Sequence, residues 1–116
     1  MPTERDYMDQ QRMRLSCGVA AYLLNAAAED VMGPTRGEAR TAYARQLAMY
    51  FCHVVFAMSL ARTGVAFSRD RSTVAYACRI IEDKRDDAGF DAWLARAEDA
   101  LRTAPPPATL TQGARS

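Results

Sequence analysis

The sequence has no uninterrupted apolar run of 18 residues, which excludes an ordinary transmembrane helix. Its first ten residues, MPTERDYMDQ, are charged and lack the apolar core of a secretory signal. Cysteine is scarce, with only Cys17, Cys52 and Cys78 at separations of 35 and 26 residues. That spacing gives neither a disulfide framework nor a zinc motif, so it predicts a chain in a reducing cytoplasm.

The sequence also lacks the residues that several kinds of catalysis require. The chain has one histidine, His53, which excludes a histidine-rich metal site or a catalytic triad. The only lysine, Lys84, is not part of a Gly-Lys-Ser/Thr sequence, so no phosphate-binding P-loop is expected. The clustered carboxylates of Asp83, Asp86 and Asp87 are typical of a solvated helix end. We therefore predict no enzyme, no cofactor and no metal.

The most abundant residue types favour helices. The chain has 116 residues, enough for one domain, and 49% of them are hydrophobic. Alanine (22) and arginine (14) dominate, with six glycines and five prolines, and good helix formers outnumber β-branched residues. An all-α fold is predicted. The net charge of +1 hides an uneven distribution, because residues 34–81 carry a local +5 and residues 82–101 a local −4.

Apolar periodicity divides the chain into helical segments. Residues 1–14 are predicted to be an N-terminal extension, residues 15–102 a helix-turn-helix domain, and the Pro-rich residues 103–116 a disordered tail. The extension either frays or lengthens the first helix. The expected helices cover 13–24, 26–32, 39–57, a segment from Leu60, a segment from Arg71 and a last segment from about Phe90 to Leu101.

Residues 59–81 carry the functional signal. Ser59 is suited to cap a helix that begins at Leu60, and the break Ser68-Arg69-Asp70 precedes a second helix with Asp70 as its N-cap. Val74, Ala77, Cys78 and Ile81 would face inward, leaving polar residues outward near the helix start. Helix, three-residue turn and helix is the layout of a helix-turn-helix, whose second helix enters the DNA major groove.

The residues themselves match a known family. Ala44 to Tyr50 (ARQLAMY), Ser59-Leu60, Gly64 to Val74 (GVAFSRDRSTV) and Tyr76-Ala77 closely resemble the C-terminal DNA-binding domain, domain IV, of the bacterial replication initiator DnaA. The upstream VAAYLLNAAAEDVMGPTR looks like that family's first helix, short second helix and basic loop. The resemblance covers roughly residues 17–99. It implies a stand-alone relative that lacks the initiator's ATPase domain.

The resemblance implies a set of DNA-binding residues. It implies that the start of the second helix contacts base edges in the major groove. It also implies that an arginine of the basic loop enters the minor groove, and Arg36 is the nearest match. Arg45 and His53 would contact phosphates. The implied set is Arg36, Arg40, Arg45, His53, Arg69, Asp70, Arg71, Ser72, Thr73 and Tyr76. His53 could instead be merely half-buried, and Tyr76 could lie on a solvated face.

Three positions depart from the family pattern: Ser68 replaces a glycine of the turn, Arg71 replaces a histidine, and Glu38 dilutes the basic loop. Arg71 can pair with a guanine edge, and the Thr73 methyl can pack on a thymine methyl. The first functional hypothesis is sequence-specific binding of double-stranded DNA at DnaA-box-like sites, regulating replication initiation from the nucleoid in the cytoplasm. The second is a protein-interaction regulator of DnaA, or of an AAA+ regulator of DnaA, with weakened DNA binding. Neither involves a membrane.

Overall fold

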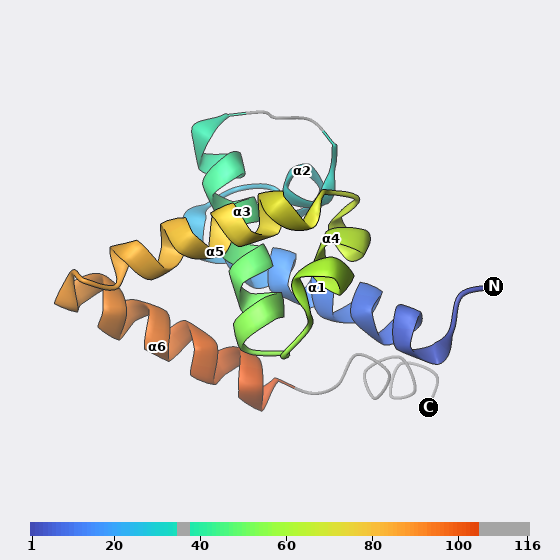
Figure 1. The fold of residues 1–116 in the computed structure, drawn as a ribbon. Helices are drawn as coiled ribbons and strands as arrows, with labels where there is room; N and C mark the ends of the chain where they lie inside the picture. Colours follow the sequence, from blue (N-terminus) through green and yellow to red (C-terminus); the bar gives the residue numbers. More distant parts are fainter. Residues whose placement is uncertain (35–37, 105–116) are drawn as a thin grey trace, which may run out of the picture.

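Six helices make up the described part of the chain. The computed structural model describes residues 1–34 and 38–104, and those ranges contain no β-strand, which confirms the all-α prediction. In chain order the helices are α1 (Glu4–Leu24), α2 (Ala28–Met32), α3 (Ala39–Val54), α4 (Leu60–Phe67), α5 (Arg71–Lys84) and α6 (Ala88–Thr103) (Figure 1).

Helix α3 is the centre of the core. It packs against α1 and α5, and α4 packs against α5 and α1. Leu47, Ala48, Phe51 and Cys52 are fully buried, because the helix is enclosed by α1 on one side and by α5 on another. A central helix that is apolar around most of its circumference is typical of a small helical core.

The first helix is longer than the periodicity predicted, so the N-terminal segment extends it rather than frays. The Thr3 hydroxyl accepts a hydrogen bond from the Asp6 backbone N–H at 3.1 Å, and the Asp6 carboxylate accepts one from the Thr3 N–H at 2.9 Å. This capping box starts a helix that runs to Leu24. Asp9 and Met13 are buried, and the predicted boundary between residues 14 and 15 falls inside α1.

Helix α3 ends at Val54, three residues earlier than predicted. Ala57 adopts a left-handed conformation with φ of 55°, which reverses the chain before α4. The Phe56 N–H donates to the Phe51 carbonyl at 3.3 Å, and the Met58 N–H donates to the Cys52 carbonyl at 3.1 Å. This turn brings the start of α4 beside the end of α3.

The last helix is held to the core by both apolar and polar contacts. Leu94 and Leu101 are buried, while Phe90 and Trp93 are half-buried against the core. Arg85, between α5 and α6, donates to the Tyr50 hydroxyl at 2.8 Å and to the buried Glu98 carboxylate at 3.0 Å, and it also pairs with Asp91. These hydrogen bonds raise the pKa of Arg85. The sequence analysis identified only the neighbouring carboxylates, as a solvated helix end, and missed this link through Arg85.

The prediction for α5 is confirmed residue by residue. Its buried residues are Val74, Ala77, Cys78 and Ile81, the predicted inner face. Of the predicted tail, Thr103 is the last residue of α6, and residues 105–116 lie outside the described part of the chain.

The three cysteines are buried thiols. Burial raises the pKa of Cys17 and of Cys52 to about 12 and that of Cys78 to about 11. Since the thiolate is the reactive form, all three thiols are unreactive at neutral pH.

No helix in residues 1–34 or 38–104 is both long and apolar enough to cross a membrane.

One buried polar atom generates a prediction about stability. The Thr63 hydroxyl in α4 is buried without a hydrogen-bond partner among the described residues. An unsatisfied buried hydroxyl is destabilising, so Thr63→Val should raise the free energy of unfolding by about 1 kcal/mol in urea denaturation. Thr63→Ser is the control, because it keeps the hydroxyl, loses the methyl group and should destabilise. A less stable Thr63→Val would contradict the placement.

Candidate nucleic-acid interface

The helix-turn-helix is built from α4, residues 68–70 and α5, as predicted. The two helices approach each other closely at Gly64. A Cβ atom at Gly64 would lie 2.6 Å from the Arg69 carbonyl oxygen and 3.3 Å from the Arg71 nitrogen. Only glycine fits beside this backbone. The contact sets how closely the turn packs on α4, and therefore where α5 begins.

The turn itself uses a left-handed residue. Ser68 has φ of 55° and ψ of 46°, and the Arg69 N–H donates to the Gly64 carbonyl at 2.8 Å. This is a Schellman-type helix end, in which the left-handed position favours glycine. The serine that replaces the family's glycine thus keeps the turn, but in a conformation that is unfavourable for a side chain.

The Arg69 side chain holds the turn from the other side. Its guanidinium donates to the Phe67 carbonyl at 3.0 Å and to the Gly33 carbonyl at 3.2 Å. Arg69 therefore ties the turn to the segment that follows α2. The basic loop predicted to enter the minor groove starts at that segment, but Arg36 lies outside the described residues.

Helix α5 begins with exposed polar side chains. Asp70 occupies the N-cap position with an extended backbone, but its side chain makes no capping hydrogen bond. Arg71, Ser72 and Thr73 are all exposed. At 100° per residue, Ser72, Tyr76 and Arg79 form the ridge opposite the buried face, and Tyr76 is 55% exposed. Polar residues therefore cover the outer surface of the first two turns.

A cleft lies on each flank of this ridge. The α3/α5 cleft is lined by Ala42, Arg45, Gln46, Met49, Arg69, Thr73, Tyr76 and Ala77. The α4/α5 cleft is lined by His53, Ser59, Leu60, Ala61, Arg71, Ser72 and Ala75. Together the two clefts hold seven of the ten predicted site residues.

Arg45 occupies a different environment from the one expected of a phosphate contact. It is only 8% exposed, and its guanidinium donates to the Val31 carbonyl at 2.9 Å and to the Asp30 carbonyl at 2.8 Å. Burial, and then the nearby Arg69, lower the pKa of Arg45. A buried cation at the carboxyl end of α2 satisfies carbonyls that the helix leaves unbonded. The geometry supports a structural role at the base of the α3/α5 cleft.

His53 is half-buried at the opposite end of α3. Its Nδ1 lies 2.7 Å from the Met58 carbonyl oxygen, so the ring is anchored to the turn between α3 and α4. The half-buried alternative for His53 is confirmed; the residue also lines the α4/α5 cleft, and its contact to a phosphate stays a prediction. Arg40 lies outside both clefts and donates to the Asn25 carbonyl at 3.2 Å.

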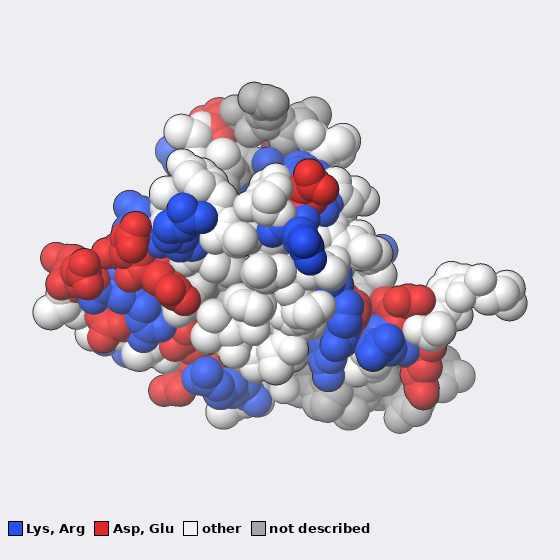
Figure 2. Space-filling view, in the orientation of Figure 1, with Lys and Arg blue, Asp and Glu red and all other residues white. Residues whose placement is uncertain are grey.

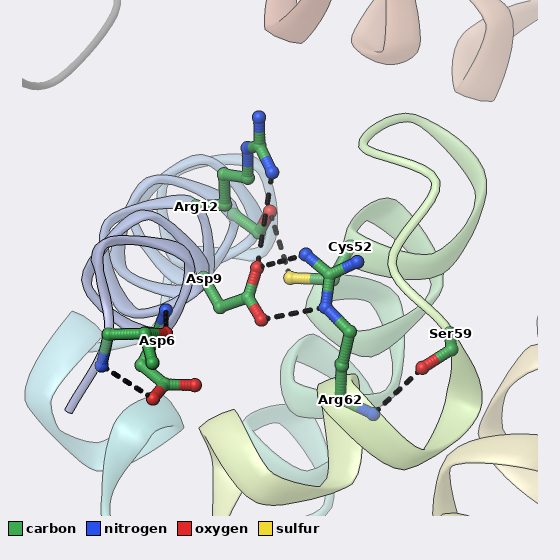
Figure 3. Close-up of polar contacts among 8 residues, drawn as sticks. Asp6, Asp9, Arg12, Cys52, Ser59 and Arg62 are labelled. Carbon is green, nitrogen blue, oxygen red and sulfur yellow. Dashed lines mark hydrogen bonds and ion pairs between the residues drawn. The ribbon is translucent and has the colours of Figure 1, made fainter. Parts of the chain in front are cut away.

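Arg62 of α4 is half of an ion pair. Its guanidinium makes two hydrogen bonds, of 2.9 and 2.6 Å, to the carboxylate of the buried Asp9, while its backbone N–H donates to the Ser59 hydroxyl at 3.0 Å (Figure 3). These hydrogen bonds raise the pKa of Arg62. The pair fixes α4 to the first half of α1, and it removes Arg62 from the candidate DNA contacts.

Charge is distributed unevenly over the surface. Figure 2 shows basic side chains around α5 and α4, and acidic side chains gathered at the turn between α5 and α6. Exposed Glu82, Asp83, Asp86 and Asp87 form that acidic end. No group of three His, Cys, Asp or Glu residues in the described ranges is arranged to hold a metal ion.

A family match accounts for this arrangement. The profile described as the bacterial dnaA protein helix-turn-helix matches residues 19–81, which is more than half of the chain. The chain belongs to the bacterial DnaA helix-turn-helix family. The matched region includes α4, the part of α5 up to Ile81 and both clefts, which confirms the resemblance to DnaA domain IV.

Similar proteins are replication initiators. The chain is 36% identical over 84 residues to chromosomal replication initiator protein DnaA 1 of Chlamydia pneumoniae, covering 72% of this chain and 18% of that protein. It is 42% identical over 65 residues to DnaA of Tropheryma whipplei strain Twist, covering 56% of this chain and 13% of that protein. The chain thus spans less than a fifth of these relatives.

A solved structure shows the same fold. The crystal structure of a DNA replication initiation factor matches with a TM-score of 0.74 and 26% sequence identity. The match covers 84% of this chain and 30% of that chain. The match extends beyond the 63 residues of the family profile, so the shared architecture includes more than the helix-turn-helix core.

The left-handed turn residue gives a testable consequence. Ser68→Gly should raise the free energy of unfolding by about 0.5–1 kcal/mol, because glycine adopts this conformation without the strain of a side chain. Ser68→Ala serves as the matched variant and should leave stability within about 0.5 kcal/mol of the wild type. Thermal and urea denaturation would measure both. Equal stability of all three proteins would show that Ser68 is unstrained.

The buried arginine gives a second consequence. Arg45→Ala should lower the free energy of unfolding by about 2–3 kcal/mol, since it removes charge-assisted hydrogen bonds to α2. Gln46→Ala, one residue along α3 and half-buried, should change stability far less. If Arg45→Ala unfolds like the wild type and only DNA affinity falls, Arg45 is an ordinary phosphate contact after all.

Proposed function

We propose that this protein binds double-stranded DNA with α5 in the major groove. The observation that carries the proposal is the pair of clefts that flank the exposed ridge of α5, each of which has polar and basic residues in its lining. A helix in the major groove has one sugar-phosphate strand on each side, and the groove is about 12 Å wide. Gln46 and His53, from the two clefts, are seven residues apart on α3, a rise of about 10.5 Å. That separation suits contacts to both strands.

Each cleft offers donors for a phosphate oxygen. The α3/α5 cleft presents Arg69, Gln46, Thr73 and the Tyr76 hydroxyl, with the charge of Arg45 beneath them. The α4/α5 cleft presents His53 and the hydroxyls of Ser59 and Ser72. These contacts position the protein on the duplex without reading its sequence. They give binding that weakens steeply as salt increases.

Base reading is assigned to the start of α5. Arg71 is the first residue of the helix, is exposed, and has no hydrogen bond or ion pair to any residue that the structure describes. Its guanidinium is therefore available for a bidentate contact to a guanine edge. Ser72 and Thr73 follow, and the Thr73 methyl suits a thymine methyl. Asp70 is exposed beside them and is suited to accept from a cytosine amino group.

The decisive variant is Arg71→Ala. It should weaken binding to the preferred duplex by about 1–3 kcal/mol and relax the base preference at one position. Fluorescence anisotropy with a DnaA-box duplex, its single-base variants and a scrambled duplex measures both effects. Arg96→Ala is the matched control, because Arg96 is an exposed arginine on α6, outside both clefts. If Arg71→Ala and Arg96→Ala behave alike, the recognition-helix assignment is wrong.

Membership of the family supports a proposal for the biological role. We propose that the protein binds DnaA-box-like sites in the nucleoid and changes the frequency of replication initiation by competing with the initiator. Overproduction followed by flow cytometry of chromosome number tests this role. The second candidate is docking on DnaA or on an AAA+ regulator of DnaA, and the acidic turn between α5 and α6 favours it. An altered origin count combined with no DNA binding in vitro would select that second role.

A further inference from the structure

The hydrogen bond of His53 fixes which ring nitrogen carries a proton. Nδ1 lies 2.7 Å from the Met58 carbonyl oxygen, and a carbonyl oxygen only accepts hydrogen bonds. Nδ1 must therefore be the N–H in the neutral ring. Neutral imidazole has a single N–H, so Nε2 then carries a lone pair and acts as an acceptor.

His53 also lines the α4/α5 cleft. Because Nδ1 is held by the backbone of the α3–α4 turn, Nε2 is the polar atom of the ring that is left for a ligand in this cleft. The other polar residues lining the cleft are Ser59, Arg71 and Ser72, and the lining includes no carboxylate. On the elements packed nearby, Arg62 of α4 is bound to Asp9, and Asp70, at the N-cap position of α5, does not line the cleft.

We infer that DNA binding by this protein takes up one proton at His53. A phosphate oxygen only accepts hydrogen bonds, so neutral His53 would place a lone pair against it. When Nε2 gains a proton from solvent, the imidazolium donates to Met58 through Nδ1 and to the phosphate through Nε2, and its positive charge faces the phosphate. The inference rests on the proposed DNA binding and specifies how one cleft contacts its strand.

The sign of the pH dependence follows directly. Since the bound state favours imidazolium, the association constant is larger at acidic than at alkaline pH. One charge-assisted contact predicts affinity roughly five- to tenfold higher at about pH 6 than at about pH 8. His53 is the only histidine in the chain, so no other histidine can cause the pH dependence.

Fluorescence anisotropy of the full chain with a labelled DnaA-box duplex, at pH 6 and pH 8 and constant ionic strength, tests the inference. Wild type should show the pH difference. His53→Gln should bind equally at both pH values, at or below the weaker wild-type level. His53→Lys should bind equally at both, near the tighter wild-type level, because its charge persists. Circular dichroism melts confirm that each variant is folded at both pH values.

The outcomes separate the inference from the proposed function. Wild-type affinity that is the same at both pH values, or a pH difference that persists in His53→Gln, would overturn proton uptake at His53 while leaving DNA binding intact. A persistent difference would point to the α-amino group of Met1 instead. Absence of DNA binding at either pH would overturn the proposed function itself.

Discussion

The burial of α3 is the constraint on which the rest of the molecule depends. This 16-residue helix forms the centre of the core, and it also contributes residues to both clefts. Gln46 and His53 cannot move apart without disturbing Leu47 and Phe51, which are fully enclosed. The spacing of the two clefts is thus set by an element that tolerates little change, because close-packed cores resist displacement.

The start of α5, like the start of α3, lacks the N-terminal stabilisation that α1 and α6 have. Helices α1 and α6 begin with side-chain caps and with acidic residues in the first turn, which suits the helix dipole. Helix α5 has neither, and it places the cation of Arg71 at the positive end of its dipole. At α5 this lack coincides with the residues proposed to contact DNA. In the proposed complex, a phosphate or a guanine edge would add negative potential to that of the Asp70 carboxylate at the N-cap position.

The accuracy of the sequence interpretation varied with the range of the interactions. The inner face of α5 was predictable because Val74, Ala77, Cys78 and Ile81 recur at helical spacing, and the turn was predictable from local capping residues. The partners of Arg62 and Arg85 were not, since Asp9 and Tyr50 are 53 and 35 residues away in the chain. Periodicity reports which face of a helix is buried, but it does not report which charge a long side chain will reach. Arg45 shows the same limit, because its motif match could not reveal that α2 would cover its guanidinium.

The closeness of Gly64 to the turn determines the effect of missense mutations at this position. A Cβ atom at this position would meet backbone 2.6 Å away, and backbone cannot step aside as a flexible side chain can. Every amino acid other than glycine carries a Cβ atom, so each missense change of this codon displaces the turn, whatever the chemistry of the new side chain. Conservative and radical replacements are equivalent here. Any substitution at Gly64 is therefore expected to disrupt the helix-turn-helix. At neighbouring positions, the severity of a substitution depends on the size and polarity of the new side chain.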